Sequence, residues 1–243
     1  MEIDKVGVVG CGLMGSGIVE VAAKSGSRVM VRETNPELLG LGRLRIEQSM
    51  ARAVEKEKLT VQEQDAALAR ISYTTELADL ARSDLIIEAI VEDPEAKSSL
   101  FRELDKLCSG RTIFASNTSS IPITEMAAAT ARADRFIGLH FFNPVPVMRL
   151  VEVVRTIATT DETFELVSDF VQIIGKVPIT AKDNSGFVVN LLLVPFMLDA
   201  IRQLERGVAS VSDIDTGMVL GCGHPMGPLT LCDFVGIDTL LRI

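Results

Sequence analysis

The fold is decided by the stretch Lys5-Val6-Gly7-Val8-Val9-Gly10-Cys11-Gly12-Leu13-Met14-Gly15. Its valines form a β-branched run that predicts a buried strand, and Gly10, Gly12 and Gly15 fit the pattern G-x-G-x-x-G. In such a turn the first glycine makes the tight bend, the second lets the backbone approach a pyrophosphate, and the third lets the helix pack closely on the strand. Helix amides and the positive end of the helix dipole then face the anion. The loop, with Leu13 and Met14 at the start of the helix, is therefore a candidate dinucleotide-binding site.

The residues after the loop complete a βαβ unit. Apolar positions continue at helical spacing as far as Gly26, and residues 29–31 predict a second buried strand that ends at Arg32 and Glu33. An acidic residue about 20 positions beyond the glycines can accept hydrogen bonds from an adenosine ribose. Glu33 occupies that place, and a surface acid closing a strand is the alternative. Because a guanidinium such as that of Arg32 can hold a 2′-phosphate, the pattern favours NAD and leaves NADP open.

Composition limits the class of protein. The chain has 243 residues, enough for one large or two modest domains, with 47% hydrophobic and 23% charged residues, as in ordinary globular proteins. A net charge of −9 argues against nucleic acid as a partner. The four cysteines form no CxxC pair, which fits a reducing compartment. With only two histidines, a zinc site is not expected.

Two features bear on location. The first strand begins almost at the first residue, so no signal peptide is expected and we predict a cytoplasmic protein. The one long apolar run, residues 187–201, contains Asn190, Pro195 and Asp199 and is too short to span a bilayer. We therefore expect a buried helix there and no membrane partner.

A long helical insertion follows the second strand. Asn35-Pro36-Glu37 is a helix-start signal, and residues 38–68 mix apolar and charged side chains at helical spacing, with a helix boundary at Thr60. This predicts a helical hairpin, longer than the connections of a minimal nucleotide-binding unit, and so indicates a second ligand. Ser49 and Lys56 would lie about two turns apart on one face. A solvated helix with scattered polar residues explains the same pattern.

Polar side chains follow the next buried strands. Residues 71–74, 84–92 and 112–116 predict strands; Glu92 ends the second of these, and Lys97 lies in the helix after it. Loops at the carboxyl ends of parallel strands bind ligands in open α/β sheets. The run 117–120, which includes Ser119, could bind a ligand or could cap the helix near residues 123–129.

A histidine and an acid then fall on successive strands. The stretch 135–146 runs from a strand through His140 and two phenylalanines to a proline-containing turn, and the strand 150–154 carries Glu152 among apolar neighbours. A buried carboxylate needs a partner, and a histidine at the edge of a sheet suits a general base. Glu152 would then fix the tautomer of His140 and support its charged form. An unrelated core histidine and an edge-strand acid are the alternative.

The composition changes near residue 184. A helix over 160–174 and a strand over 176–180 precede that point, and from Asn184 onward the pattern is helical and apolar. We expect one domain over residues 1–183 and a helical domain over 184–243. Asn190, inside the apolar stripe, is a buried amide that a ligand could satisfy.

These motifs together resemble the L-3-hydroxyacyl-CoA dehydrogenase family, and within it the bacterial 3-hydroxybutyryl-CoA dehydrogenases of the short-chain type. The similarity covers nearly the whole chain, and the most discriminating motif is GLHFFNPVP at 138–146. The other segments that carry it are GCGLMGSG at 10–17, EAIVED at 88–93, SNTSS at 116–120, LVEVV at 150–154 and NSGFVVN at 184–190.

The resemblance implies an α/β fold: a Rossmann-type doubly wound sheet with a helical-hairpin insertion, followed by an all-helical C-terminal domain that carries a homodimer contact. It implies NAD-dependent oxidation of an L-3-hydroxyacyl-CoA to a 3-ketoacyl-CoA, and the reverse reduction. The resemblance implies His140 as general base with Glu152 as its partner, and Ser119 and Asn190 at the 3-oxygen and thioester. The residues that it places at the cofactor are Glu92, Lys97, Ser119 and Asn143. Those that it places at coenzyme A are Ser49, Lys56 and Lys97.

Members of this family are expected to continue some forty residues beyond Ile243, so the helical domain is expected to be truncated. Two other functions stay open. One is a non-catalytic dinucleotide-binding relative, and the other is a dehydrogenase of a free hydroxy acid or sugar acid.

Overall fold

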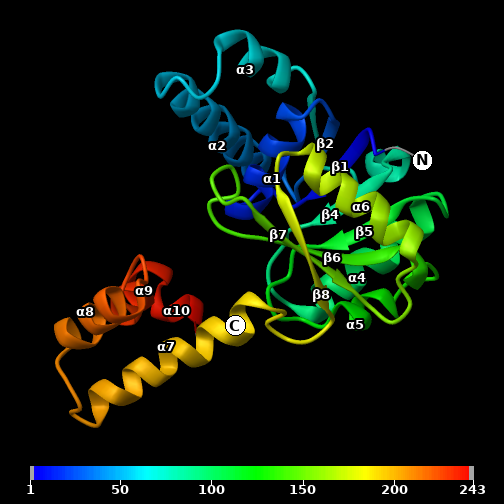
Figure 1. Ribbon diagram of the computed structural model, residues 1–243. Helices are drawn as coiled ribbons and strands as arrows, with labels where there is room; N and C mark the ends of the chain where they lie inside the picture. The colour runs from blue at the N-terminus through cyan, green and yellow to red at the C-terminus, as the bar shows by residue number, and fades with distance from the viewer. Residues whose placement is uncertain (1–2, 241–243) are drawn as a thin grey trace. The chain divides into compact units, whose positions relative to one another are not determined.

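The computed structural model describes residues 3–240 and divides into two compact units, Met1–Asp183 and Asn184–Ile243. The first unit holds a sheet flanked by helices, and the second is helical in its described part (Figure 1). The predicted fold class, an α/β unit of Rossmann type with a helical hairpin and an all-helical unit after it, is confirmed. The expectation about the chain beyond Ile243 lies outside the described residues.

The strands of the first unit are β1 (Lys5–Val9), β2 (Arg28–Arg32), β3 (Ile71–Thr74), β4 (Leu85–Glu88), β5 (Ile113–Ser116), β6 (Phe136–Phe141), β7 (Leu150–Arg155) and β8 (Val177–Lys182). Its helices are α1 (Leu13–Lys24), α2 (Pro36–Glu55), α3 (Val61–Leu68), α4 (Pro94–Leu107), α5 (Ile123–Ala127) and α6 (Asp161–Ile173), with short 3₁₀ helices η1 (Leu77–Arg82) and η2 (Ala133–Arg135). The second unit contains α7 (Val189–Glu205), α8 (Val211–Cys222), α9 (Pro228–Val235) and α10 (Ile237–Leu240).

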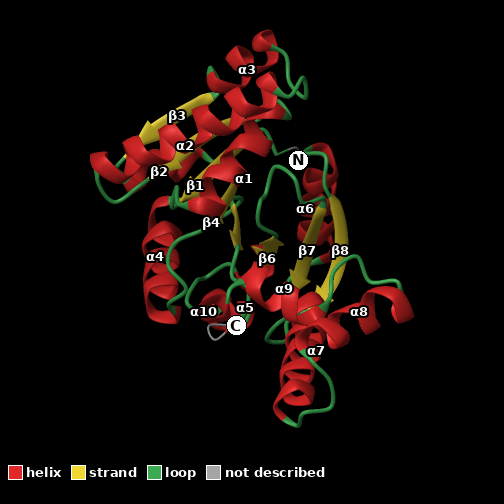
Figure 2. Cartoon of the chain, turned by 90° about the vertical axis from the view of Figure 1, so that its left-hand side faces the viewer, coloured by secondary structure: helices red, strands yellow, loops and turns green. Residues whose placement is uncertain are grey.

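The described strands form one sheet in the order β3-β2-β1-β4-β5-β6-β7-β8. Strands β1 to β6 are parallel, β7 runs antiparallel to β6, and β8 runs parallel to β7. Figure 2 shows this order from β3 at the upper left to β8 at the right. The strand order reverses between β1 and β4, and in doubly wound sheets ligands bind outside the carboxyl ends of the strands at such a switch point.

Alternation along the strands separates two packed faces. Side chains such as Val8, Ile87 and Leu139 belong to the core cluster that also contains residues of α1, α2 and α6. The opposite face carries Phe114 and Phe136, which pack with Phe101 of α4 at ring-centroid distances of 5.5 and 4.6 Å. Because side chains alternate with a period of two, the residues that share a face with Phe114 and Phe136 include Ser116 and His140.

The predicted helical hairpin is present as α2 and α3, drawn in blue-green above the sheet in Figure 1. Thr60 starts α3 with a capping box, in which its side chain accepts from the amide of Glu63 and the Glu63 carboxylate accepts from the amide of Thr60. The helix α2 packs tightly on the glycine loop, since a Cβ at Gly42 would lie 2.5 Å from the Cys11 sulfur. The hairpin is therefore anchored on the loop that opens the chain.

Two predicted boundaries are wrong. The strand expected over 84–92 ends at Glu88, because the Glu88 carboxylate accepts the Ile90 amide at 2.7 Å and takes the backbone out of the ladder. Glu92 consequently lies in the loop before α4. The helix expected from Asn184 begins at Val189, since Gly186 and Phe187 have positive φ of 79° and 47°.

In the second unit, a remote carboxylate caps a helix. Asp215 of α8 accepts from the amides of Leu229 and Thr230, at 2.8 and 2.9 Å, in the first turn of α9. A side chain at Gly227 would collide with Asp215, its Cβ lying 2.3 Å from the aspartate Cβ. None of the helices in residues 3–240 is long and apolar enough to cross a membrane.

Candidate active site

The three glycines of the opening loop have different surroundings. Gly10 has φ of +92°, and a Cβ there would lie 2.5 Å from the Ala89 carbonyl oxygen. A Cβ at Gly15 would lie 1.9 Å from the carbonyl oxygen of Gly10. At Gly12, by contrast, a Cβ would meet no atom within 4 Å. Gly10 and Gly15 are thus required by the fold, whereas Gly12 leaves open space beside the start of α1.

Glu33 lies at this loop, as predicted from its place after β2. Its carboxylate accepts from the amides of Cys11 at 2.6 Å and Thr34 at 3.0 Å. The neighbouring Arg32 directs its Nε to the Thr75 carbonyl at 3.3 Å. Burial, and then the charge of Glu33, raise the pKa of the Cys11 thiol to about 12, so this cysteine is an unreactive packing residue.

His140 and Glu152 are directly opposite each other on the antiparallel strands β6 and β7. The Nδ1 atom of His140 lies 2.6 Å from Oε2 of Glu152, with the histidine 6% exposed and the glutamate fully buried. An ionised carboxylate can only accept a hydrogen bond, so opposite one the Nδ1 atom carries the proton, and a neutral imidazole then has its lone pair on Nε2. The His140 ring also packs against Phe142 with centroids 4.5 Å apart. The pair predicted from sequence is thus brought together, and Glu152 lies on an interior strand because β8 pairs with β7.

A buried ionic cluster lies at the carboxyl end of β4. The ammonium of Lys97 is 2.7 Å from Glu88 Oε1 and 2.9 Å from Glu92 Oε2, and the Ser116 hydroxyl donates to Glu88 Oε2 at 2.5 Å. Burial raises the pKa of Glu88 despite Lys97, Ser116 and the Ile90 amide, which act to lower it. Burial also acts to raise the pKa of Glu92, but Lys97, Thr118 and the Ser119 amide outweigh it and the net pKa is lowered.

This cluster holds the loop that carries Ser119. The Thr118 hydroxyl and the Ser119 amide both donate to Glu92 Oε1, the latter at 3.0 Å. Asn117 ties the next strand to the same edge, since its Oδ1 accepts from the Phe141 amide at 3.0 Å. The ends of β4, β5 and β6 are therefore fixed side by side, with Ser119 and His140 on neighbouring strand ends.

The structure buries Lys97 in this cluster. Its side chain is 1% exposed and its ammonium is held by two carboxylates. The contacts with the cofactor and coenzyme A that the resemblance implies for Lys97 remain predictions. Sequence reasoning gave no individual role to Glu88 or Ser116, and it considered Thr118 only as part of the polar run 117–120. Glu88 could have been predicted as a site residue, because it is a carboxylate inside the apolar run 85–90. A charge buried in such a run needs a partner.

The other predicted site residues come from three other segments of the chain. Ser49 is half-buried in α2, and Lys56 is exposed at its C-terminal end. Asn143 is exposed and precedes a cis peptide bond to Pro144. Asn190 is 9% exposed at the start of α7, in the second unit. Among residues 3–240, no group of three or more His, Cys, Asp and Glu side chains could hold a metal ion.

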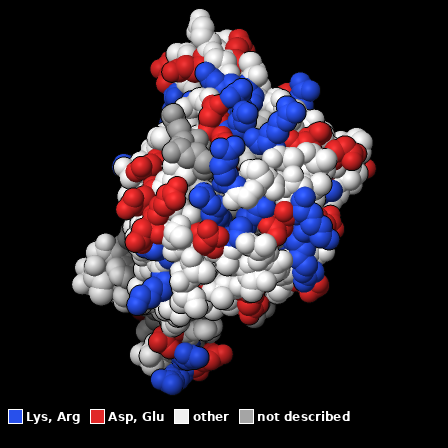
Figure 3. Space-filling view, turned by 90° about the vertical axis from the view of Figure 1, so that its right-hand side faces the viewer, with Lys and Arg blue, Asp and Glu red and all other residues white. Residues whose placement is uncertain are grey.

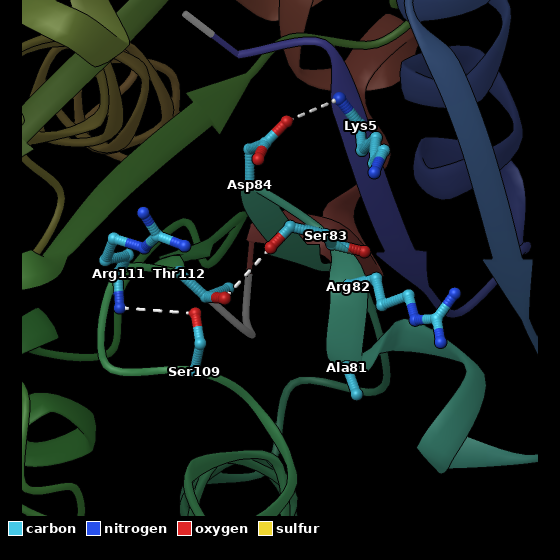
Figure 4. Close-up of a pocket in the computed structure, with 8 residues that line it drawn as sticks. All are labelled: Lys5, Ala81, Arg82, Ser83, Asp84, Ser109, Arg111 and Thr112. Carbon is cyan, nitrogen blue, oxygen red and sulfur yellow. Dashed lines mark hydrogen bonds between the residues drawn. The ribbon is translucent and has the colours of Figure 1, made fainter. Parts of the chain in front are cut away.

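A separate polar cavity opens at the other end of the strands, opposite their carboxyl ends. It has a volume of about 370 Å³ and lies at the amino ends of β1, β4 and β5, where Lys5, Arg82 and Arg111 contribute basic side chains. Figure 4 shows Arg111 and Arg82 on opposite sides of the cavity, with the Arg82 side chain extending away from the other residues. Figure 3 shows Lys and Arg side chains gathered across the centre of one face, bordered by Asp and Glu. The cavity contains none of the predicted site residues.

Two family models match the chain. Residues 5–184 match the 3-hydroxyacyl-CoA dehydrogenase NAD binding domain, and residues 186–243 match the 3-hydroxyacyl-CoA dehydrogenase C-terminal domain. The matches abut at the division between the two units.

Known dehydrogenases of 3-hydroxyacyl-CoA are similar in sequence to almost the whole chain. A 3-hydroxybutyryl-CoA dehydrogenase of Mycobacterium tuberculosis is 51% identical over 99% of this chain and 85% of its own length. The human mitochondrial hydroxyacyl-coenzyme A dehydrogenase is 49% identical over 98% of this chain and 77% of its own length. Among solved structures, the (S)-3-hydroxybutyryl-CoA dehydrogenase of Ralstonia eutropha is 45% identical with a TM-score of 0.96, over 99% of this chain and 85% of that one.

Proposed function

Since this chain belongs to the 3-hydroxyacyl-CoA dehydrogenase family, we propose that it oxidises an L-3-hydroxyacyl-CoA, in particular 3-hydroxybutyryl-CoA, to the 3-ketoacyl-CoA with NAD, and catalyses the reverse reduction. The observation that carries the proposal is the 2.6 Å contact of His140 with Glu152 at paired positions of β6 and β7. It provides a general base whose tautomer is fixed by the sheet itself.

His140 is the general base of the oxidation. Its Nε2 accepts the proton of the substrate 3-hydroxyl, and in the reduction the same atom returns it. A base of this kind contributes about 10²- to 10⁴-fold to the rate. Glu152 holds Nδ1–H and stabilises the imidazolium that forms, and it stays ionised throughout.

The glycine loop fits NAD. Gly12 leaves open space where the pyrophosphate would pass, and the loop presents the first amides of α1 to it. Glu33, already bonded to the loop amide of Cys11, would accept from the adenosine ribose. When bound, NAD would accept the hydride that leaves C3 of the substrate. The engagement of Arg32 with a backbone carbonyl supports NAD over NADP.

The remaining roles follow the strand ends. We assign Ser119 to the substrate 3-oxygen, and Leu13, Met14, Glu92 and Asn143 to the cofactor. Lys97 takes a positioning role, because its ammonium orients Glu92, whose carboxylate in turn holds Thr118 and Ser119.

Ser49 and Lys56 of the hairpin are proposed contacts for coenzyme A, and Asn190 for the thioester. The seven-residue spacing puts Ser49 and Lys56 about two turns apart along α2. The exposed ammonium of Lys56 suits a phosphate of the coenzyme. A dehydrogenase of a free hydroxy acid would have no use for these side chains.

The test is an assay of acetoacetyl-CoA reduction with NADH and NADPH in parallel, beside free acetoacetate. We expect turnover of the thioester with NADH, and a drop of about 10²- to 10⁴-fold in kcat for His140→Ala with NAD affinity retained. His224→Ala, in the second unit, is the matched control. A non-catalytic relative would bind NAD and turn over nothing, and equal rates with acetoacetate would favour the free-acid dehydrogenase.

We also propose a homodimer formed through the second unit. Leu192, Leu220 and Phe234 are 71%, 80% and 76% exposed there, and an apolar cavity of about 670 Å³ lies between α7 and α9. Exposed apolar surface on this scale marks an interaction site.

The four cysteines are all free, which supports a reducing compartment and hence the cytoplasm. The name of the human relative places that protein in mitochondria.

A further inference from the structure

The loop between β6 and β7, residues 142–149, closes the hairpin that carries His140 and Glu152. It contains Asn143, and its centre is a turn in which the Pro144 carbonyl accepts from the amides of Val147 and Met148, both at 2.9 Å. The position of this turn therefore sets where Asn143 lies relative to the end of β6.

A buried lysine holds the turn from outside the hairpin. The ammonium of Lys176 donates to the carbonyl of Val145 at 2.5 Å and to that of Met148 at 2.8 Å, and the residue is 8% exposed. Lys176 directly precedes β8, whose first amide, that of Val177, donates to the Arg149 carbonyl at 2.8 Å. One side chain thus extends the pairing of β7 with β8 into the loop.

The same turn packs on α1, the helix that follows the nucleotide-binding loop. A Cβ at Gly17 of α1 would lie 2.7 Å from Cβ of Val145 and 3.3 Å from Cδ of Pro146. The turn is therefore in direct contact with α1, and Lys176 fixes its carbonyl groups.

The charge of Lys176 is not balanced by a contact ion pair within residues 3–240. Glu20 of α1, which is 1% exposed, forms an ion pair with Lys24 through Oε1 at 3.5 Å, and its Oε2 has no hydrogen-bond partner in that range. Burial lowers the pKa of Lys176, Lys24 lowers it further and Glu20 raises it. Burying an ammonium costs free energy. Both hydrogen bonds of the Lys176 ammonium go to the 144–148 turn. We infer that the position of this turn is what the buried lysine maintains.

We propose that Lys176 is a positioning residue of the dehydrogenase site, which fixes the 144–148 turn against α1 and thereby aligns Asn143 and the end of β6 with the nicotinamide side of the cofactor. The proposal rests on the proposed function. Without the ammonium the 144–148 turn keeps its backbone hydrogen bonds but loses the two bonds from Lys176, and only the bond from Val177 to Arg149 still joins the loop to β8. A misplacement of about 1 Å at a reacting centre can cost about 100-fold in rate.

The experiment compares Lys176→Met, which keeps the length and removes the donors, with Lys176→Arg, which keeps a cation with donors. Lys182→Met, an exposed residue of the same strand, is the matched control. We expect Lys176→Met to lower kcat for acetoacetyl-CoA reduction by about 10- to 100-fold, with the KM for acetoacetyl-CoA nearly unchanged and most of the activity restored by Lys176→Arg.

A binding readout separates positioning from general stability. ADP-ribose would contact the glycine loop and Glu33 but lacks the nicotinamide, so its affinity should be unchanged in Lys176→Met while that of NADH falls. Equal losses for both ligands, kinetics matching those of Lys182→Met, or unfolding of both Lys176 variants would each overturn the proposal. If the wild-type chain binds NADH but does not reduce acetoacetyl-CoA, the proposed function fails, and the ratio of the two affinities still decides the role of Lys176.

Discussion

The glycines of the opening loop show how the same residue type serves two purposes. Gly15 is required by the fold, because its Cβ would overlap the Gly10 carbonyl oxygen at 1.9 Å. Gly12 faces open space. A substitution at each position therefore separates stability from cofactor binding.

We predict that Gly12→Ala folds with wild-type stability and loses NAD affinity, since the new methyl group occupies the space proposed for the pyrophosphate. Gly15→Ala should instead lower the stability by several kcal/mol, as severe overpacking of the backbone does. Thermal denaturation and NAD titration of both variants check this. Unchanged NAD affinity in a folded Gly12→Ala protein would contradict the proposed path of the pyrophosphate past Gly12.

The carboxylate opposite His140 gives a second prediction for a single residue. In Glu152→Gln, the amide group can donate to Nδ1 and favour the wrong tautomer, so the lone pair at Nε2 is lost. We expect kcat to fall by about 10²- to 10⁴-fold with the fold retained. Glu165→Gln, exposed on α6, is the control in steady-state assays and circular dichroism. A near-normal kcat for Glu152→Gln contradicts the assigned role of Glu152.

At the scale of elements, strand ends and helix starts are joined by carboxylates from distant parts of the chain. Glu88 and Glu92 fix the end of β5 through Ser116, Thr118 and Ser119. In the second unit Asp215 fixes the start of α9 by accepting hydrogen bonds from its first amides. Such bonds define the angle at which an element leaves its neighbour.

We predict that Asp215→Ala destabilises the second unit by about 1 kcal/mol, the usual cost of a lost helix cap. Burial acts to raise the pKa of Asp215, but bonds from Thr230 and Leu229 outweigh it and the net pKa is lowered. The stabilisation is therefore complete above the unfolded pKa of about 3.9 and is lost as the pH falls through the lower folded value.

Urea denaturation of wild type and Asp215→Ala at several pH values measures this difference. It should be constant near neutrality and shrink below about pH 4. Asp233→Ala, an exposed aspartate at the other end of α9, should show no such loss. A difference that grows on acidification would contradict the capping role.

At the scale of the whole molecule, the apolar surface of the second unit leads to a prediction about assembly. Light scattering should give a mass of twice the 26.3 kDa chain, and Leu192→Glu should shift it toward the monomer. Ile157→Glu, at a fully exposed apolar position of the first unit, should leave the mass unchanged. A monomeric wild-type chain at micromolar concentration would argue against the proposed dimer.

The sequence alone determined the elements whose signal is local. The glycine loop, the helix boundary at Thr60, the buried strands and the pair of His140 and Glu152 could all be predicted, because each depends on residue type and spacing along one segment. The resemblance to the family, carried by GLHFFNPVP at 138–146, supplied the activity.

Only the tertiary structure decided the partners of buried charges. Glu88 with Lys97, Asp215 with α9, and Lys176 with the 144–148 turn join residues between 9 and 31 positions apart. No periodicity along the chain encodes such pairs, because they depend on which strand and helix ends the sheet order brings together. For the same reason the burial of Lys97, which the resemblance implies to be a ligand contact, could not be predicted from the sequence.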